Sequence, residues 1–248
     1  MNDLMWIGGQ TFAMKNAANY KLRMDFGCMT SESGAFLEQL ADGIIGLSMT
    51  NTTLPYLLHE KQITNTKIFA LCFRIGGGIF TLGGVDPSLH TPPAVLKFAE
   101  LYPSKDDEWG IRISNIFLRD TKGKSFTLEN PYIGKGQPSI IKDMRSGGVI
   151  IDSASSDTYF PQSMTERFRR VFYAITGLDY SADPIFITAD QLNTIPELVI
   201  SIEAKDGTEF NVTMIWSNFL ELTGEDRMYQ FRIFFRCSIN IEAYHYMQ

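Results

Sequence analysis

The sequence has few cysteines and few histidines, which limits the kinds of site that it can hold. Its 248 residues include three of each. Three cysteines exclude a scaffold held by many disulfides, and no paired-cysteine spacing of a zinc site is present. His59, His90 and His245 lie far apart in the sequence, so a Ser-His-Asp or Cys-His nucleophile has little support. We expect neither a metal nor a cofactor.

The three cysteines leave two interpretations open. Cys28 and Cys72 can form a disulfide in an oxidising compartment, which leaves Cys237 without a partner. The alternative is that all three are buried free thiols, because free cysteine behaves as a small hydrophobic residue.

Long hydrophobic runs and basic runs are also missing. No stretch approaches the ~18 apolar residues of a membrane span, so we expect no transmembrane segment in this chain. Lys and Arg number 22 against 28 Asp and Glu, which gives a net charge of −6. This acidic balance argues against a nucleic-acid partner. With 44% hydrophobic and 20% charged residues, the composition is that of a globular protein.

What the sequence does have is a series of strand signals. Some segments alternate apolar and polar residues, others are short apolar runs, and Gly76–Gly78 and Asp206-Gly207 are typical hairpin turns. Residues 42–48 and 149–151 are apolar enough to predict buried strands. The strands and hairpins are predicted at residues 20–28, 42–48, 69–84, 111–118, 149–152 and 198–214.

Two helices are predicted as well. A short one begins after Thr53, with Pro55 in its first turn. A longer one follows Ser163, where Ser163 and Glu166 have the spacing of a capping box, and Gly177 stands where a C-terminal cap belongs.

A change of composition divides the chain. Pro92-Pro93 and the acidic run Asp106–Glu108 separate two sets of strand signals. We therefore predict two β-rich lobes with a boundary near residues 100–108, one over residues 1–103 and the other over residues 104–248.

One segment has the residues for acid–base chemistry. Val149–Ile151 is apolar, and Asp152 follows it with Ser153, Ala154 and Ser155. The two serine hydroxyls and nearby backbone N–H groups can fix the rotamer of the Asp152 carboxylate. A turn of this composition is also common without catalysis, so the segment alone is a weak signal.

The context of this segment strengthens the signal. Gly148–Ser153 followed by Asp157–Pro161 resembles the second catalytic loop of pepsin-like aspartic proteases. The order and approximate spacing of further segments are kept from about residue 20 to about residue 235. The resemblance implies a mostly β, bilobal pepsin-like aspartic protease fold, incomplete at both ends of the chain. The other segments similar to that family are Asp42–Leu47, Phe80–Pro87, Trp109–Ile113 and Ile195–Leu198.

The family's enzymes use two aspartates, one in each lobe, which share a proton and activate the water that cleaves an internal peptide bond. The resemblance implies that Asp152 is the second of these, supported by Ser153, Ala154 and Ser155. Residues 1–41 contain no Asp-Thr/Ser-Gly triplet for the first aspartate, and Ala154 stands where the second triplet has glycine. We therefore expect a truncated aspartic endopeptidase whose residues 1–248 are inactive alone.

The alternative is a non-catalytic relative or fragment that binds a peptide or protein. Both interpretations imply a polypeptide partner and a monomer, and the resemblance implies a secreted or lysosome-like or vacuole-like location. In a secretory pathway Asn51 and Asn211 are candidate glycosylation sites, because each begins an Asn-x-Thr triplet. Asn51 is the better candidate, since Asn211 falls within a predicted strand.

Overall fold

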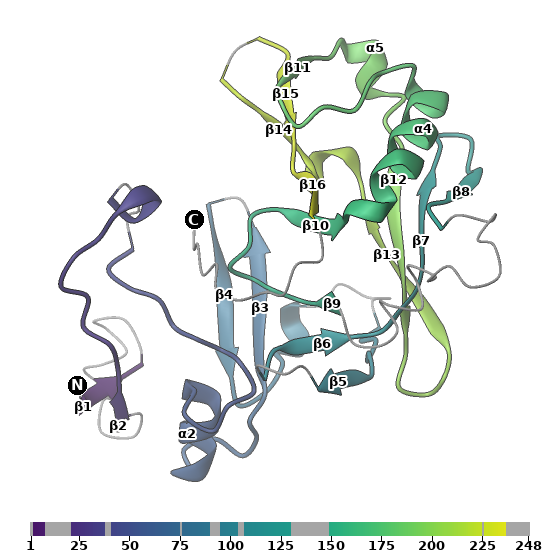
Figure 1. Ribbon diagram of the computed structural model, residues 1–248. Coiled ribbons are helices and arrows are strands. Elements are labelled where there is room, and N and C mark those ends of the chain that lie inside the picture. The colour runs from purple at the N-terminus through teal and green to yellow at the C-terminus, as the bar shows by residue number, and fades with distance from the viewer. Residues whose placement is uncertain are drawn as a thin grey trace. The chain divides into compact units, whose positions relative to one another are not determined.

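The structure is a computed structural model, and its described residues form two compact units, Met1–Leu96 and Lys97–Gln248. Figure 1 shows the first in purple to blue and the second in teal to yellow. The lobe boundary between residues 103 and 104 stays a prediction. The described residues are 2–7, 21–37, 41–74, 76–89, 95–103, 107–129, 149–224 and 226–236.

The described part of the first unit contains two antiparallel strand pairs. β1 pairs with β2, and β3 pairs with β4 so that Phe69 lies opposite Leu82. The strand predicted at residues 20–28 and the hairpin predicted at residues 69–84 are confirmed over these described residues. The elements are β1 (Asn2–Trp6), β2 (Lys21–Asp25), η1 (Gly34–Leu37), α2 (Leu54–Glu60), β3 (Phe69–Arg74), β4 (Gly77–Leu82) and η2 (Pro87–Leu89).

The helix α2 forms the small core of this unit. Thr53 precedes it in an extended conformation and Pro55 stands in its first turn, as the sequence predicts. Leu54 and Leu58 face inward and are buried together with Leu22 of β2.

The prediction of a buried strand at residues 42–48 is wrong. These residues form no strand, and the side chains of Ile44 and Ile45 are 48% and 57% exposed. An apolar run becomes a buried strand only where neighbouring strands and a core receive it. The described core of the first unit is confined to the surroundings of α2 and does not reach these isoleucines.

The second unit is built around a four-stranded antiparallel sheet with the order β13-β12-β7-β8. The hairpin predicted at residues 198–214 is confirmed as β12 and β13. The described residues of this unit also form two three-stranded sheets and one strand pair. Its strands are β5 (Leu101–Pro103), β6 (Trp109–Ile111), β7 (Ile113–Arg119), β8 (Ser125–Thr127), β9 (Val149–Ile150), β10 (Thr158–Pro161), β11 (Ile185–Phe186), β12 (Glu197–Glu203), β13 (Glu209–Met214), β14 (Leu220–Leu222), β15 (Met228–Phe231) and β16 (Ile233–Arg236). Its helices are η3 (Gln162–Met164), α4 (Thr165–Thr176), α5 (Ala189–Leu192) and η4 (Trp216–Asn218).

An aromatic cluster around α4 forms the centre of the core of the second unit. Phe168 and Phe172 stack with ring centroids 5.9 Å apart, and Phe231 meets Phe172 edge-on at 5.3 Å. Tyr180 packs against Phe168 at 5.0 Å and donates its hydroxyl hydrogen to the backbone carbonyl of Ile233. Each buried ring contributes about 2–3 kcal/mol by leaving water. The cluster therefore ties α4 to β15 and β16.

The N-terminus of α4 differs from the prediction. Ser163 and Glu166 form no capping box, because residues 162–164 already wind as a 3-10 turn and the helix begins at Thr165 without a side-chain cap. The prediction for the other end is confirmed, since Gly177 adopts the left-handed conformation with φ of 70° and its N–H bonds to the carbonyl of Tyr173.

The described chain is mostly β with a few short helices, as predicted. None of the helices in the described ranges is long and apolar enough to cross a membrane. The strand predicted at residues 149–151 is present as β9, but it is not buried, because Ile150 and Ile151 are 41% and 58% exposed. Among the described strands, β9 pairs with β6 alone and stands at the end of the order β5-β6-β9.

Candidate active site

The candidate site is the loop that joins β9 to β10 in the second unit. Its first end is anchored where the backbone N–H of Ile151 bonds to the carbonyl of Trp109, 2.9 Å away. Its other end is anchored where the N–H of Thr158 bonds to the carbonyl of Arg232, also at 2.9 Å. Between these two anchors, residues 152–156 are exposed. The loop is therefore an accessible turn fixed at both ends.

The Asp152 carboxylate is held by its own loop. Its Oδ1 accepts a hydrogen bond of 2.9 Å from the backbone N–H of Ala154. Its Oδ2 accepts one of 2.6 Å from the hydroxyl of Ser155. Bonds from both sides fix the rotamer of the carboxylate and leave part of its accepting capacity for a water or substrate group. Within the described ranges, Ser153 makes no hydrogen bond to Asp152.

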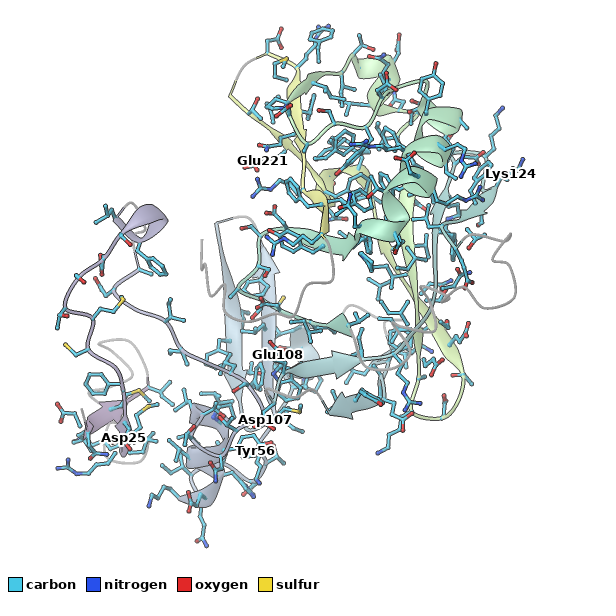
Figure 2. All side chains as sticks on the ribbon, viewed as in Figure 1. Asp25, Tyr56, Asp107, Glu108, Lys124 and Glu221 are labelled. Carbon is cyan, nitrogen blue, oxygen red and sulfur yellow. The ribbon has the colours of Figure 1, made fainter. Side chains whose placement is uncertain are left out.

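The last residue of the loop, Asp157, belongs to a cluster of charges. Its side chain is 12% exposed, and its Oδ1 lies 2.8 Å from Nε of Arg232. The N–H of this Nε does not point at the oxygen, so the contact is an ion pair rather than a hydrogen bond. Oε2 of Glu221, on β14, lies 3.4 Å from the same Nε. Figure 2 labels Glu221 on this part of the molecule.

Tyr159 joins the same cluster from β10. Its hydroxyl donates a hydrogen bond of 3.0 Å to Oδ2 of Asp157. The guanidinium of Arg236, on the neighbouring strand β16, lies 3.5 Å from the centre of the Tyr159 ring. Burial and the hydrogen bond to Asp157 raise the pKa of the Tyr159 hydroxyl above its usual value, so this group stays a neutral donor.

Sequence reasoning found Asp152 and its neighbours but assigned no role to Asp157, Arg232 or Tyr159. Asp157 and Arg232 meet because β10 and β16 pair in parallel, with Thr158 opposite Ile233. A parallel pair joins segments that are distant in the sequence, so no local pattern marks it. A local signal for Asp157 was available, because it is an acidic residue in a segment, residues 153–160, whose other side chains are apolar or carry a hydroxyl.

The other predicted residues lie elsewhere. Cys28 and Cys72 are exposed free thiols in the first unit, so these two are not the buried thiols of the alternative. Their pairing stays a prediction. Cys237 lies outside the described residues, as do His90 and His245.

Both candidate glycosylation residues are exposed. Asn51 lies in the turn before α2, and the hydroxyl of Thr53 in its triplet donates to the carbonyl of Thr50, 2.9 Å away. Asn211 lies on the edge strand β13, where its Oδ1 accepts a hydrogen bond of 2.8 Å from Ser201. Glycosylation at either site stays a prediction.

Nothing in the described ranges groups three or more His, Cys, Asp or Glu side chains as a metal ion would require. The chemistry that this loop itself offers is that of a carboxylate held by two donors. Such a group can accept a proton from a water molecule or orient it.

Comparisons with known proteins relate the chain to aspartic proteases. Aspartic protease 5 of Toxoplasma gondii is 35% identical over 81 residues, which is 30% of this chain and 8% of that protein. Aspartic proteinases 36 and 39 of Arabidopsis thaliana are 28% and 27% identical over 144 residues, covering 56% and 55% of this chain and 26% and 25% of theirs. The chain thus matches at most about a quarter of the length of these curated relatives. No model of a known family matches it.

Among solved structures, basic 7S globulin from soybean superposes with a TM-score of 0.53 at 16% identity, covering 83% of this chain and 53% of that one. This likeness concerns the fold alone. It confirms the predicted fold class, a mostly β, pepsin-like fold. The bilobal arrangement and the incompleteness of the chain stay predictions.

Proposed function

We propose that the chain is part of an aspartic-type endopeptidase and that Asp152 is one of its two catalytic aspartates. The names of the similar proteins and the pepsin-like fold support the relation. The observation that carries the proposal is the Asp152 carboxylate itself, held by the Ala154 N–H and the Ser155 hydroxyl in an exposed loop.

The proposed chemistry needs a second carboxylate close to Asp152. One carboxylate takes a proton from a water molecule while the oxygen of that water attacks the peptide carbonyl carbon. The other carboxyl group gives its proton to the carbonyl oxygen. As the C–N bond breaks, the proton taken from the water passes to the nitrogen of the leaving amine, and a hydroxyl of the tetrahedral intermediate returns a proton to the second carboxylate. Ala154 and Ser155 keep Asp152 in one rotamer throughout, so that its remaining lone pairs face the water.

The second aspartate must come from outside residues 1–248 in this proposal. The sequence contains no Asp-Thr/Ser-Gly triplet besides the altered one at Asp152, where Ala154 takes the place of glycine. We therefore propose that residues 1–248 alone do not cleave peptides. The same observation favours a second candidate function, a non-catalytic protein that binds a peptide or protein.

The experiment compares residues 1–248 with the chain extended by the upstream reading frame of its transcript. Cleavage of internally quenched peptides is measured at about pH 3 to 4, where an aspartate dyad holds a single proton. We expect the extended chain to cleave and residues 1–248 not to cleave. An upstream frame without an Asp-Thr/Ser-Gly triplet, with no cleavage by either form, would favour the binding function instead.

A further inference from the structure

We propose that Asp157 is a positioning residue for Asp152. Its ion pair with Arg232 fixes the end of the loop on which the Asp152 carboxylate meets the N–H of Ala154 and the hydroxyl of Ser155. This inference rests on the proposed function, because it concerns the aspartate to which that function assigns the chemistry.

Arg232 contacts the end of the loop with both its backbone and its side chain. Its carbonyl accepts the N–H of Thr158 at 2.9 Å, and its guanidinium lies against Asp157. The N–H of Arg232 in turn bonds to the carbonyl of Phe219 at 2.8 Å. The anchor of the loop is therefore a residue that is itself held in the body of the second unit.

The ion pair between Asp157 and Arg232 is largely buried. The side chains of Asp157 and Arg232 are 12% and 25% exposed, and Oδ1 of Asp157 is buried. Salt and water screen such a pair much less than an exposed one. Removing one charge would leave the other partly buried without its partner, and the loop end would move to expose it.

Asp157 is not itself a candidate for the second catalytic carboxylate. Its Oδ1 faces Arg232 and its Oδ2 accepts the hydroxyl hydrogen of Tyr159. Both oxygens of this carboxylate are therefore engaged by partners of the second unit and are not turned toward a substrate. Its contribution is therefore to the geometry of the loop.

The effect on Asp152 follows from the length of the loop. Asp157 lies five positions after Asp152, and residues 152–156 are exposed, with little packing to hold them. Without the ion pair to Arg232, the end of the loop at Asp157 can move and the turn can open. The hydrogen bonds from Ala154 and Ser155 to Asp152 would then form only part of the time.

The test uses residues 1–248 and does not depend on cleavage. A hydrogen bond to a carboxylate changes the chemical shift of the donating amide proton. Asp152→Ala removes the acceptor, so the difference in the Ala154 amide proton shift between the parent and this variant measures the contact. We expect Asp157→Asn to lose about half or more of that difference, because a freed loop forms the contact only part of the time. Asp157→Glu, which keeps the charge, should retain most of it.

The controls separate the ion pair from general changes. Asp183→Asn removes an exposed acid of the same unit and should leave the Ala154 amide proton shift unchanged. Arg232→Gln breaks the pair from its other side and should repeat the loss, which keeps the test available if Asp157→Asn does not fold. An unchanged shift in both folded variants would overturn the proposal.

The outcome is independent of the proposed catalytic role. If extended chains cleave peptides equally well with and without Asp152, the proposed function fails while the shift measurement still reports on the loop. If Asp152 is required for cleavage but the Ala154 amide proton shift is unchanged by the substitutions of Asp157 and Arg232, the positioning role alone fails.

Discussion

The hydroxyl of Ser155 donates a 2.6 Å hydrogen bond to Oδ2 of Asp152, three residues earlier in the same exposed loop. Asp152 also accepts the N–H of Ala154 through its other oxygen, at 2.9 Å. The carboxylate is thus oriented by local contacts, and these contacts lead to the first prediction.

Ser155→Ala should lower the turnover of a peptide-cleaving form of the protein without unfolding it. Loss of one hydrogen bond of about 1 kcal/mol corresponds to a loss in kcat of several-fold to tenfold. The stability should change by less than about 0.5 kcal/mol, because the side chain is exposed. Ser156→Ala, on the next exposed residue, is the matched control, and an equal loss in both variants would argue against a specific role for Ser155.

Phe172→Ala should be among the most damaging substitutions in the second unit. Phe172 is fully buried, stacked on Phe168 and edge-on to Phe231. Truncation leaves a cavity in this aromatic cluster and should lower the free energy of unfolding by about 3–5 kcal/mol, measured by urea denaturation. Tyr173→Ala, whose side chain is 55% exposed on the same helix, should change it by less than about 0.5 kcal/mol.

Gly177→Ala should destabilise the end of α4 through its backbone. Gly177 has φ of 70°, and a Cβ built there meets no atom within 4 Å, so backbone strain rather than a clash sets the cost. We expect a loss of about 1 kcal/mol in the free energy of unfolding. Gly177→Asn should lose less, because asparagine tolerates the left-handed conformation, and a larger loss for Asn than for Ala would contradict this explanation.

The buried hydroxyl of Tyr180 should make stability depend on alkaline pH. Burial raises the pKa of Tyr180 above its unfolded value, so its contribution to stability is complete below about pH 10 and is lost as the pH rises further. The free energy of unfolding, measured by urea denaturation, should be lower at about pH 10.5 than at about pH 8. Tyr180→Phe should lower stability at pH 8 but reduce that fall, and an unreduced fall would show that other groups cause it.

Local patterns predicted the elements that local interactions decide. Asp206-Gly207 in a turn between two alternating runs specifies the β12–β13 hairpin, and Gly177 specifies the end of α4. The contact of Ser155 with Asp152 is local as well, and the composition of the loop indicated it.

Burial and long-range pairing could not be predicted in the same way. Ile44 and Ile45, like Ile150 and Ile151, have the composition of buried strands, yet they are exposed because no described core receives them. The meeting of Asp157 with Arg232 depends on the parallel pairing of β10 with β16, which nothing in either segment specifies alone.

Cleavage of an internally quenched peptide by the upstream-extended chain tests most directly whether Asp152 is a catalytic aspartate. We predict that Asp152→Asn lowers the cleavage rate by about 10³-fold or more, while Asp183→Asn leaves it unchanged. A cleavage rate in Asp152→Asn equal to that of the parent would contradict the account.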